Sequence, residues 1–149
     1  MRSGSADETE KIGERIAGEL SSGTVVALYG NIGAGKTCLI KGIIRGLGCS
    51  DLVTSPTYTI VHEYTVINQN SHKSFPLYHI DAYRLNNDED FENTGAMELL
   101  SNGGIALIEW SERIPRSLPS TAISITIHIT GAYDRVIQIS GIEALHEHI

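Results

Sequence analysis

One eight-residue segment, Gly30–Thr37 (GNIGAGKT), limits the possible folds more than any other part of the chain. It matches the phosphate-loop pattern G-x-x-x-x-G-K-S/T at every fixed position. Glycines let such a loop turn with positive φ, so that successive N–H groups point at phosphate oxygens, and the helix that follows adds the positive end of its dipole. The alternative is a glycine-rich turn with a fortuitous Lys-Thr pair. Phosphate loops join a buried strand to a helix, so the flanking sequence distinguishes the two.

Both flanking elements are present in the sequence. Residues 24–29 (TVVALY) are apolar and β-branched, which predicts a strand buried on both faces. Residues 36–47 predict a helix that a glycine ends. Upstream, Ser5 and Glu8 form a capping-box pattern ahead of a predicted helix over residues 6–20. The chain is therefore expected to contain an α/β domain with a site for a nucleoside triphosphate.

The remaining sequence predicts further strands and little additional helix. The segments with strand character are residues 57–67, 75–84, 105–108, 123–129 and 135–140. The first two flank a polar loop and predict a hairpin, whereas residues 86–93 predict a loop or short helix leading into residues 97–100. These elements predict an α/β, three-layer P-loop NTPase fold. Its mixed sheet would be parallel in the centre, antiparallel at one or both margins, and flanked by helices.

Composition restricts the class of protein further. With 149 residues, 41% hydrophobic and 19% charged, the chain predicts one globular domain over residues 5–149 behind a flexible tail at residues 1–4. It has no run of about 20 apolar residues and no secretory leader, and Cys38 and Cys49 have neither metal-site nor disulfide spacing. A cytoplasmic protein without a membrane span is expected. The net charge of −7 argues against a protein that binds DNA or RNA by itself.

Two carboxylates follow apolar strands and are candidates for the chemistry. Glu109 follows residues 105–108, and Asp81 follows residues 77–80. Ligands of open α/β sheets bind at the carboxyl ends of strands. A P-loop ATPase needs one carboxylate to help hold Mg²⁺ and one group to orient the attacking water. The alternatives are a turn residue or a partner for Arg84 in the case of Asp81, and a solvated strand end in the case of Glu109.

Three further features concern the nucleotide. Residues 53–57 (VTSPT) lie where P-loop proteins often have a switch loop, and Thr57 would then sense the γ-phosphate, although a plain Ser-Pro turn fits the spacing equally well. The N/T-K-x-D pattern of guanine-specific enzymes is absent from the sequence, which favours ATP. Trp110, the only tryptophan, suits either a core anchor or a wall of the site.

Four motifs taken together resemble the TsaE (YjeE) family: Gly30–Thr37, Val53–Val61, His79–Arg84 and Leu107–Trp110. The resemblance covers nearly the whole chain. TsaE is a bacterial ATPase that works with TsaB and TsaD to make threonylcarbamoyladenosine in tRNA. The resemblance therefore implies ATP and Mg²⁺ as ligands, the TsaB–TsaD complex as partner, and contact with tRNA only through those partners.

The resemblance also implies roles for single residues. Thr37 and Glu109 would hold Mg²⁺, and Lys36, Asp81, Glu109 and Thr57 would take part in hydrolysis. The nucleotide would be contacted by Thr9, Gly30, Asn31, Gly33, Ala34, Gly35, Lys36, Thr37, Cys38 and Trp110. The family loop commonly starts Gly-Asp-Leu and ends Lys-Thr-Thr, whereas this loop starts Gly-Asn-Ile and continues Lys-Thr-Cys. The second threonine hydroxyl is thus missing, and Cys38 becomes a candidate for oxidation or alkylation beside the phosphates.

The main functional hypothesis is Mg²⁺-dependent hydrolysis of ATP to ADP and phosphate, coupled to the partner proteins. Hydrolysis would be slow without them, because no arginine finger is evident and only Arg84 and Arg135 are candidates within the chain. Two alternatives stay open. One is a small-molecule P-loop kinase, although the seven arginines are scattered and no insertion is long enough for a lid. The other is a subunit whose assembly is gated by nucleotide binding without hydrolysis.

Overall fold

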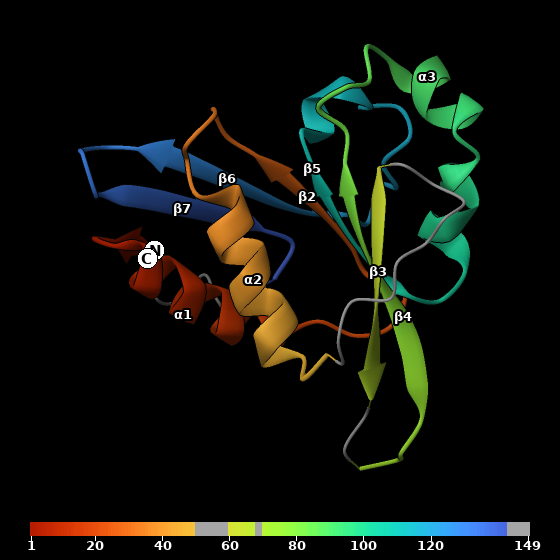
Figure 1. Cartoon of the computed structure of the whole chain (residues 1–149), viewed down its shortest axis with the longest axis horizontal. Helices are drawn as coiled ribbons and strands as arrows, with labels where there is room; N and C mark the ends of the chain where they lie inside the picture. The colour runs from red at the N-terminus through yellow and green to blue at the C-terminus, as the bar shows by residue number, and fades with distance from the viewer. Residues whose placement is uncertain (50–59, 68–69, 143–149) are drawn as a thin grey trace.

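A mixed sheet forms the middle layer of the protein (Figure 1). The computed structural model describes residues 1–49, 60–67 and 70–142, and within these ranges the sheet has seven strands in the order β1-β7-β6-β2-β5-β4-β3. The strands are β1 (Arg2–Ser3), β2 (Val25–Tyr29), β3 (Val61–Ile67), β4 (Ser74–Asp81), β5 (Ile105–Glu109), β6 (Ile123–Ile129) and β7 (Arg135–Ser140). The central strands β6, β2, β5 and β4 are parallel, and both margins are antiparallel. The predicted mixed sheet is confirmed.

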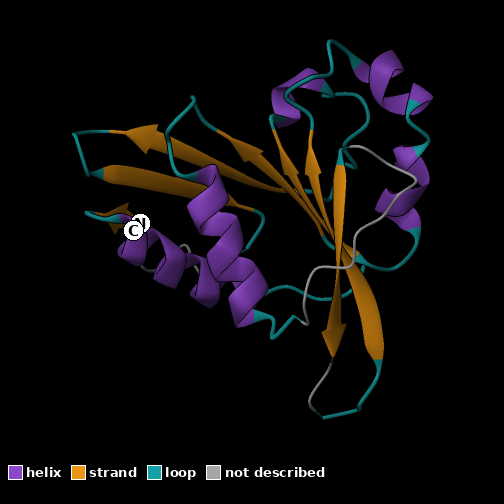
Figure 2. Cartoon of the chain, in the orientation of Figure 1, coloured by secondary structure: helices purple, strands orange, loops and turns teal. Residues whose placement is uncertain are grey.

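Helices cover both faces of this sheet (Figure 2). Helices α1 (Ala6–Ala17) and α2 (Lys36–Gly46) pack on one face, over a core that includes Leu28 and Leu107. The other face is covered by α3 (Asp88–Asn93) and the 3₁₀ segment η1 (Ala96–Ser101), over a core that includes Ile80 and Ile108. A second 3₁₀ segment, η2 (Ser111–Arg113), directly follows the end of β5. Neighbouring residues of each central strand thus point into two separate cores, which confirms the three-layer α/β fold.

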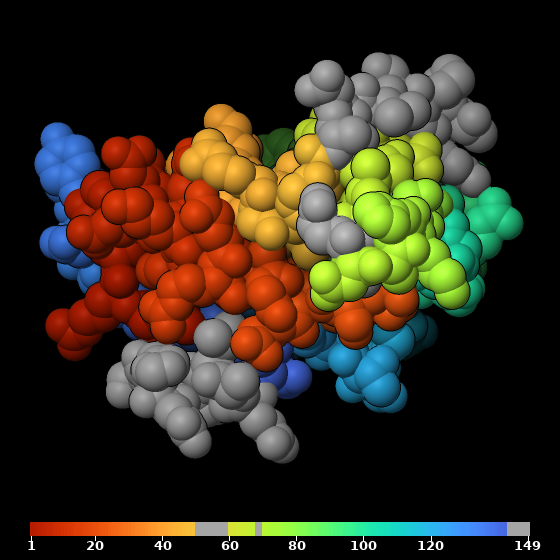
Figure 3. All heavy atoms as spheres, turned by 90° about the horizontal axis from the view of Figure 1, so that it is seen from below, coloured from red at the N-terminus to blue at the C-terminus, as the bar shows by residue number. Residues whose placement is uncertain are grey.

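Close packing between α1 and α2 depends on glycine. A Cβ atom on Gly42 would lie 2.0 Å from the carbonyl oxygen of Glu10, and one on Gly13 would lie 2.3 Å from that of Leu39. Larger side chains at these positions would therefore push the two helices apart. Figure 3 shows α1 (red to orange) and α2 (yellow-orange) in direct contact on the surface. Because α2 begins at Lys36, this contact also fixes the position of the phosphate loop (Gly30–Thr37).

The N-terminal residues differ from the prediction. Residues 1–4 were expected to form a flexible tail, but Arg2–Ser3 form β1, which pairs antiparallel with β7. The N-terminal ammonium of Met1 donates a hydrogen bond of 2.8 Å to the Ile137 carbonyl, and Met1 is buried. The expectation of a flexible tail is therefore wrong. A two-residue edge strand has no periodic pattern of its own, and its pairing comes entirely from β7.

Other boundaries agree closely with the predictions. Helix α1 begins with the Ser5 hydroxyl accepting the Glu8 N–H at 3.1 Å, and it ends at Ala17, before the predicted end at residue 20. Residues 18–20 instead form tighter i→i−3 bonds, which are common where a helix ends. The β3–β4 hairpin is present, residues 88–93 form the short helix, and residues 57–59 lie outside the described part. No helix in the described residues is long and apolar enough to cross a membrane.

Candidate functional site

A cavity of about 540 Å³ opens at the edge of the sheet where the central parallel strands end. Its walls come from the phosphate loop, the start of α2, and the ends of β4 and β5. The residues that line it are Ile32, Gly33, Ala34, Gly35, Lys36, Thr37, Cys38, Asp81, Tyr83, Glu109 and Trp110. Segments distant in the sequence meet there because the carboxyl ends of parallel strands share one edge.

The phosphate loop joins the buried strand β2 to α2, as its motif predicts. Gly33 and Gly35 have φ of +80° and +107°, a left-handed conformation that other residues rarely adopt. At Gly30, a Cβ atom would lie 2.9 Å from the Ile127 carbonyl oxygen on β6. The loop thus needs glycine for two reasons: backbone conformation at its tip, and space against the sheet at its base. Asn31 belongs to the loop but lies outside the residues that line the cavity.

Lys36 lies at the inner wall of the cavity and is 5% exposed. Its ammonium donates a hydrogen bond to the Gly30 carbonyl and lies 3.5 Å from the centroid of the Trp110 ring. Burial lowers the pKa of Lys36, and the carboxylates around it, Glu112 first, partly oppose that effect. The ammonium is therefore largely removed from water and lies beside the loop that would surround a phosphate.

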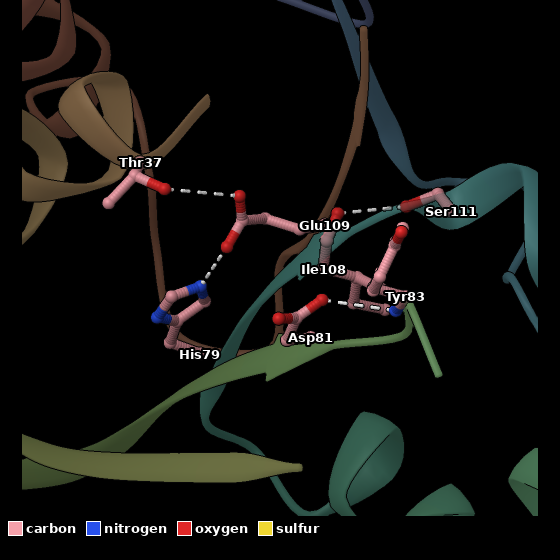
Figure 4. Close-up of polar contacts among 7 residues, drawn as sticks. All are labelled: Thr37, His79, Asp81, Tyr83, Ile108, Glu109 and Ser111. Atoms are coloured by element: carbon pink, nitrogen blue, oxygen red, sulfur yellow. Dashed lines mark hydrogen bonds and ion pairs between the residues drawn. The ribbon is translucent and has the colours of Figure 1, made fainter. Parts of the chain in front are cut away.

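Glu109 joins three elements through its two carboxylate oxygens (Figure 4). The Thr37 hydroxyl donates to Oε1 across 3.5 Å, and Nε2 of His79 lies 2.6 Å from Oε2. Burial alone would raise the pKa of Glu109, but the hydrogen bond and charge of His79, with contributions from Lys36 and Thr37, outweigh it. The net effect is a lowered pKa, so Glu109 is a carboxylate at neutral pH.

Asp81 lies directly beside Glu109 in the register between β4 and β5. Its Oδ1 accepts the N–H of Tyr83 at 3.0 Å (Figure 4). Among the described residues the Asp81 side chain has no other hydrogen-bond partner, and it forms no ion pair with the exposed Arg84. Oδ2 is thus left available at the mouth of the cavity, whereas both oxygens of Glu109 are engaged.

Trp110 forms a wall of the cavity and is also partly buried against the core that includes Ile80 and Ile108. It has φ of +59°, a conformation that costs a residue other than glycine about 1–3 kcal/mol. The turn directs the ring across the cavity, where it lies 5.0 Å from the Tyr83 ring and covers Lys36. The guanidinium carbon of Arg113 lies 5.8 Å from the centroid of the Tyr83 ring and 6.0 Å from that of the Trp110 ring. The two aromatic rings therefore restrict the access of water to Lys36.

The oxygen atoms of Thr37 and Glu109 fit a magnesium ion. Both are hard donors and face each other at 3.5 Å beside the phosphate loop. Within residues 1–49, 60–67 and 70–142, no three or more His, Cys, Asp or Glu side chains converge in a way that could hold a metal. Mg²⁺ commonly takes only one or two protein groups and completes its shell with phosphate and water, so two donors suffice.

A second cavity of about 180 Å³ also borders the phosphate loop. It is bounded by the start of α1, the loop itself, Cys38 and the turn between β6 and β7. Thr9 lines this cavity, but its hydroxyl is engaged, 2.7 Å from Ser3 Oγ and 3.2 Å from the Ser5 carbonyl. Thr57, the predicted switch residue, lies outside the described residues.

One residue of the site, His79, was not among the predicted ones, and another, Arg135, was predicted only as a possible arginine finger. His79 is two positions before Asp81 on β4, so both side chains are on the same face of the strand, and the period of two could have identified it. Arg135 reaches the phosphate loop from β7, and nothing in the sequence indicates that contact. The first was a missed pattern, whereas the second depends on strand order.

Comparisons with known proteins identify one family to which the chain is similar. A family model described as "Threonylcarbamoyl adenosine biosynthesis protein TsaE" matches residues 3–137. A protein named as a tRNA threonylcarbamoyladenosine biosynthesis protein TsaE from Treponema pallidum is 38% identical over 136 residues, covering 91% of this chain and 96% of its own. A protein of the same name from Bacillus subtilis is 35% identical over 141 residues, covering 95% of this chain and 84% of its own.

The fold is similar to that of a solved structure. A crystal structure of Bacillus subtilis YdiB superposes with a TM-score of 0.72 at 32% sequence identity, covering 99% of this chain and 87% of that one. The family match extends from β1 into β7 and so includes every element that lines the main cavity. The chain belongs to the TsaE family.

Proposed function

We propose that the protein is a Mg²⁺-dependent ATPase whose hydrolysis of ATP to ADP and phosphate drives the TsaB–TsaD complex in threonylcarbamoyladenosine modification of tRNA. The observation that carries this proposal is the pairing of Asp81 and Glu109 on adjacent strands, facing Lys36 and Thr37 across one cavity. A phosphate loop alone would serve any nucleotide-binding protein. Two carboxylates at its edge supply one group for the metal and another for water.

The residues divide the chemistry between them. The N–H groups of the phosphate loop and the Lys36 ammonium would bind the phosphates and stabilise the charge that develops on the γ-phosphoryl group. Thr37 and Glu109 would hold Mg²⁺, which neutralises phosphate charge when bound. Asp81 would orient the attacking water through Oδ2, because both oxygens of Glu109 already have partners.

The cavity also supports slow hydrolysis by the isolated protein. No arginine among the described residues lines it. An arginine finger supplied by a partner typically accelerates such reactions by about 10³–10⁵-fold. The net charge of −7 suits a protein that reaches tRNA through its partners, in the cytoplasm where tRNA is modified.

Steady-state phosphate release tests the proposal. The full chain should release phosphate from ATP slowly and only with Mg²⁺, and the rate should rise at least about tenfold when TsaB and TsaD are added. Equal rates with and without the partners would contradict the coupling. Transfer of the γ-phosphate to a metabolite instead of water would favour the small-molecule kinase.

His79 is expected to set the affinity for Mg²⁺ through Glu109. His79→Ala leaves Oε2 of Glu109 without its partner, so the magnesium concentration for half-maximal ATP hydrolysis should rise about 10–100-fold, as when outer-shell partners are lost. His79→Gln keeps a hydrogen-bond donor and should show a smaller rise. ADP binding measured without magnesium should be unchanged in both variants.

A neighbouring histidine provides the control for this experiment. His62 on β3 touches the edge of the His79 ring, with the ring centroids 5.8 Å apart, and its side chain is exposed. His62→Ala should leave the magnesium dependence close to that of the wild type. An unchanged magnesium dependence in His79→Ala would show that Glu109 is positioned without His79.

A further inference from the structure

Arg135, the first residue of β7, holds the tip of the phosphate loop from outside the main cavity and lines the second cavity. Its Nε donates to the Ala34 carbonyl at 3.0 Å, and its Nη2 donates to the Gly33 carbonyl at 3.1 Å. Its Nη1 donates to the carbonyls of Gly131 and Asp134, at 3.0 and 2.8 Å. Four of the five guanidinium N–H groups are thus bound to backbone carbonyls.

This arrangement matches a requirement of every phosphate loop. A loop that turns its N–H groups toward phosphate oxygens turns carbonyls outward, where only solvent or another part of the protein can bind them. The planar guanidinium fork fits two neighbouring acceptors, a geometry that a lysine ammonium cannot reproduce. The Ala34 carbonyl and the Gly35 N–H belong to the same peptide group. A cation bound to the carbonyl oxygen polarises this group, so the Gly35 N–H becomes a stronger hydrogen-bond donor.

Arg135 itself is held firmly in place. Its backbone lies between two strands, in register with Ile129 of β6 and Ser3 of β1. The base of the loop also rests on β6, where Gly30 approaches Ile127 closely. The β6–β7 hairpin therefore supports the phosphate loop at both its base and its tip.

We propose that Arg135 is a positioning residue for nucleotide binding, which keeps the tip of the phosphate loop in the conformation that receives phosphates. The inference rests on the proposed nucleotide site. It also reassigns Arg135, a candidate for an arginine finger by sequence, because its guanidinium points at the outer carbonyls of the loop and lies outside the main cavity.

The two roles of Arg135 make opposite predictions. A residue that positions the loop acts before chemistry, so its loss should weaken ATP and ADP binding equally and leave kcat at saturation close to that of the wild type. A finger acts on the γ-phosphoryl group, so its loss should lower kcat by about 10³-fold or more and leave ADP affinity unchanged.

The experiment measures ADP and ATP affinity by calorimetry, kcat at saturating ATP, and thermal unfolding. Arg135→Gln should raise both Kd values at least about tenfold, the factor expected for one or two charge-assisted hydrogen bonds. Arg135→Lys, which keeps the charge and the fold, should lie between this variant and the wild type. Free guanidinium ion at millimolar concentration should partly restore ADP binding to Arg135→Ala, which a purely structural role would not produce.

Arg116→Gln, at an exposed position remote from the loop, serves as the control. Unchanged ADP affinity in both Arg135→Gln and Arg135→Lys would overturn the inference, and so would a loss confined to kcat. A wild-type protein that binds neither nucleotide would instead overturn the proposed function. The two failures are therefore distinguishable.

Discussion

Lys36→Ala is expected to abolish nucleotide-dependent activity while leaving the fold intact. The ammonium is the single cation in the described wall of the main cavity, and a lysine at this position of a phosphate loop reaches the β- and γ-phosphates. Losing one preorganised donor to a transition-state anion typically lowers kcat by about 10²–10³-fold, and ATP affinity should fall as well. Phosphate release and ATP titration measure the two effects.

The stability of this variant should be close to that of the wild type. Burial already disfavours the charged form of Lys36, as its lowered pKa shows, so removing the ammonium relieves a desolvation cost. Lys41→Ala is the matched control, because Lys41 is exposed on the same helix. Reconstituted tRNA modification with TsaB and TsaD should require wild-type Lys36 and tolerate the Lys41 variant. Full modification with Lys36→Ala would contradict the proposed function.

Asp81→Asn should separate binding from hydrolysis. The amide keeps the size of the side chain and can still accept the Tyr83 N–H, but it cannot take up a proton from water as the Oδ2 carboxylate oxygen can. General-base or water-positioning groups typically contribute about 10²–10⁴-fold to rate, so kcat should fall by that amount. ATP affinity should stay within about threefold of the wild type, because the phosphate loop and Lys36 are unchanged.

The same variant tests the gating alternative. If nucleotide binding alone drives the partner complex, Asp81→Asn will still support full tRNA modification although it no longer hydrolyses ATP. On the proposed function, modification is lost together with hydrolysis. Asp7→Asn, at an exposed position in the first turn of α1, controls for the loss of one negative charge. Hydrolysis at the wild-type rate in Asp81→Asn would show that another group positions the water.

Local patterns in the sequence were sufficient for most of the fold. Hydrophobic runs identified the central strands, alternation identified β6, and the phosphate loop placed the strand before it and the helix after it. Each of these signals comes from residues that are close together in the sequence. The spacing of buried residues differs between a helix and a strand, so a short segment is enough to tell them apart. Predictions were less accurate at the ends, such as the last turn of α1, where tertiary contacts decide how far an element extends.

Features that depend on pairing over long distances could not be predicted in this way. The two residues of β1 have no pattern, and they form a strand only because β7 offers an edge. Arg135 contacts the phosphate loop from 101 positions away, because β7 is paired to β6 and β6 to β2. The order of strands in a sheet results from the packing of the whole core, so no local window of sequence contains it.

The amino-acid sequence by itself identified the phosphate loop and the two carboxylates that follow apolar strands, because loop conformation and strand burial are local properties. The folded structure added which of those groups meet. It pairs Asp81 with Glu109, directs Glu109 to both Thr37 and His79, and places Arg135 behind the loop. These contacts follow from register and strand order, which only the assembled sheet determines. That assembly turns a recognisable motif into a site in which each polar group has a distinct position.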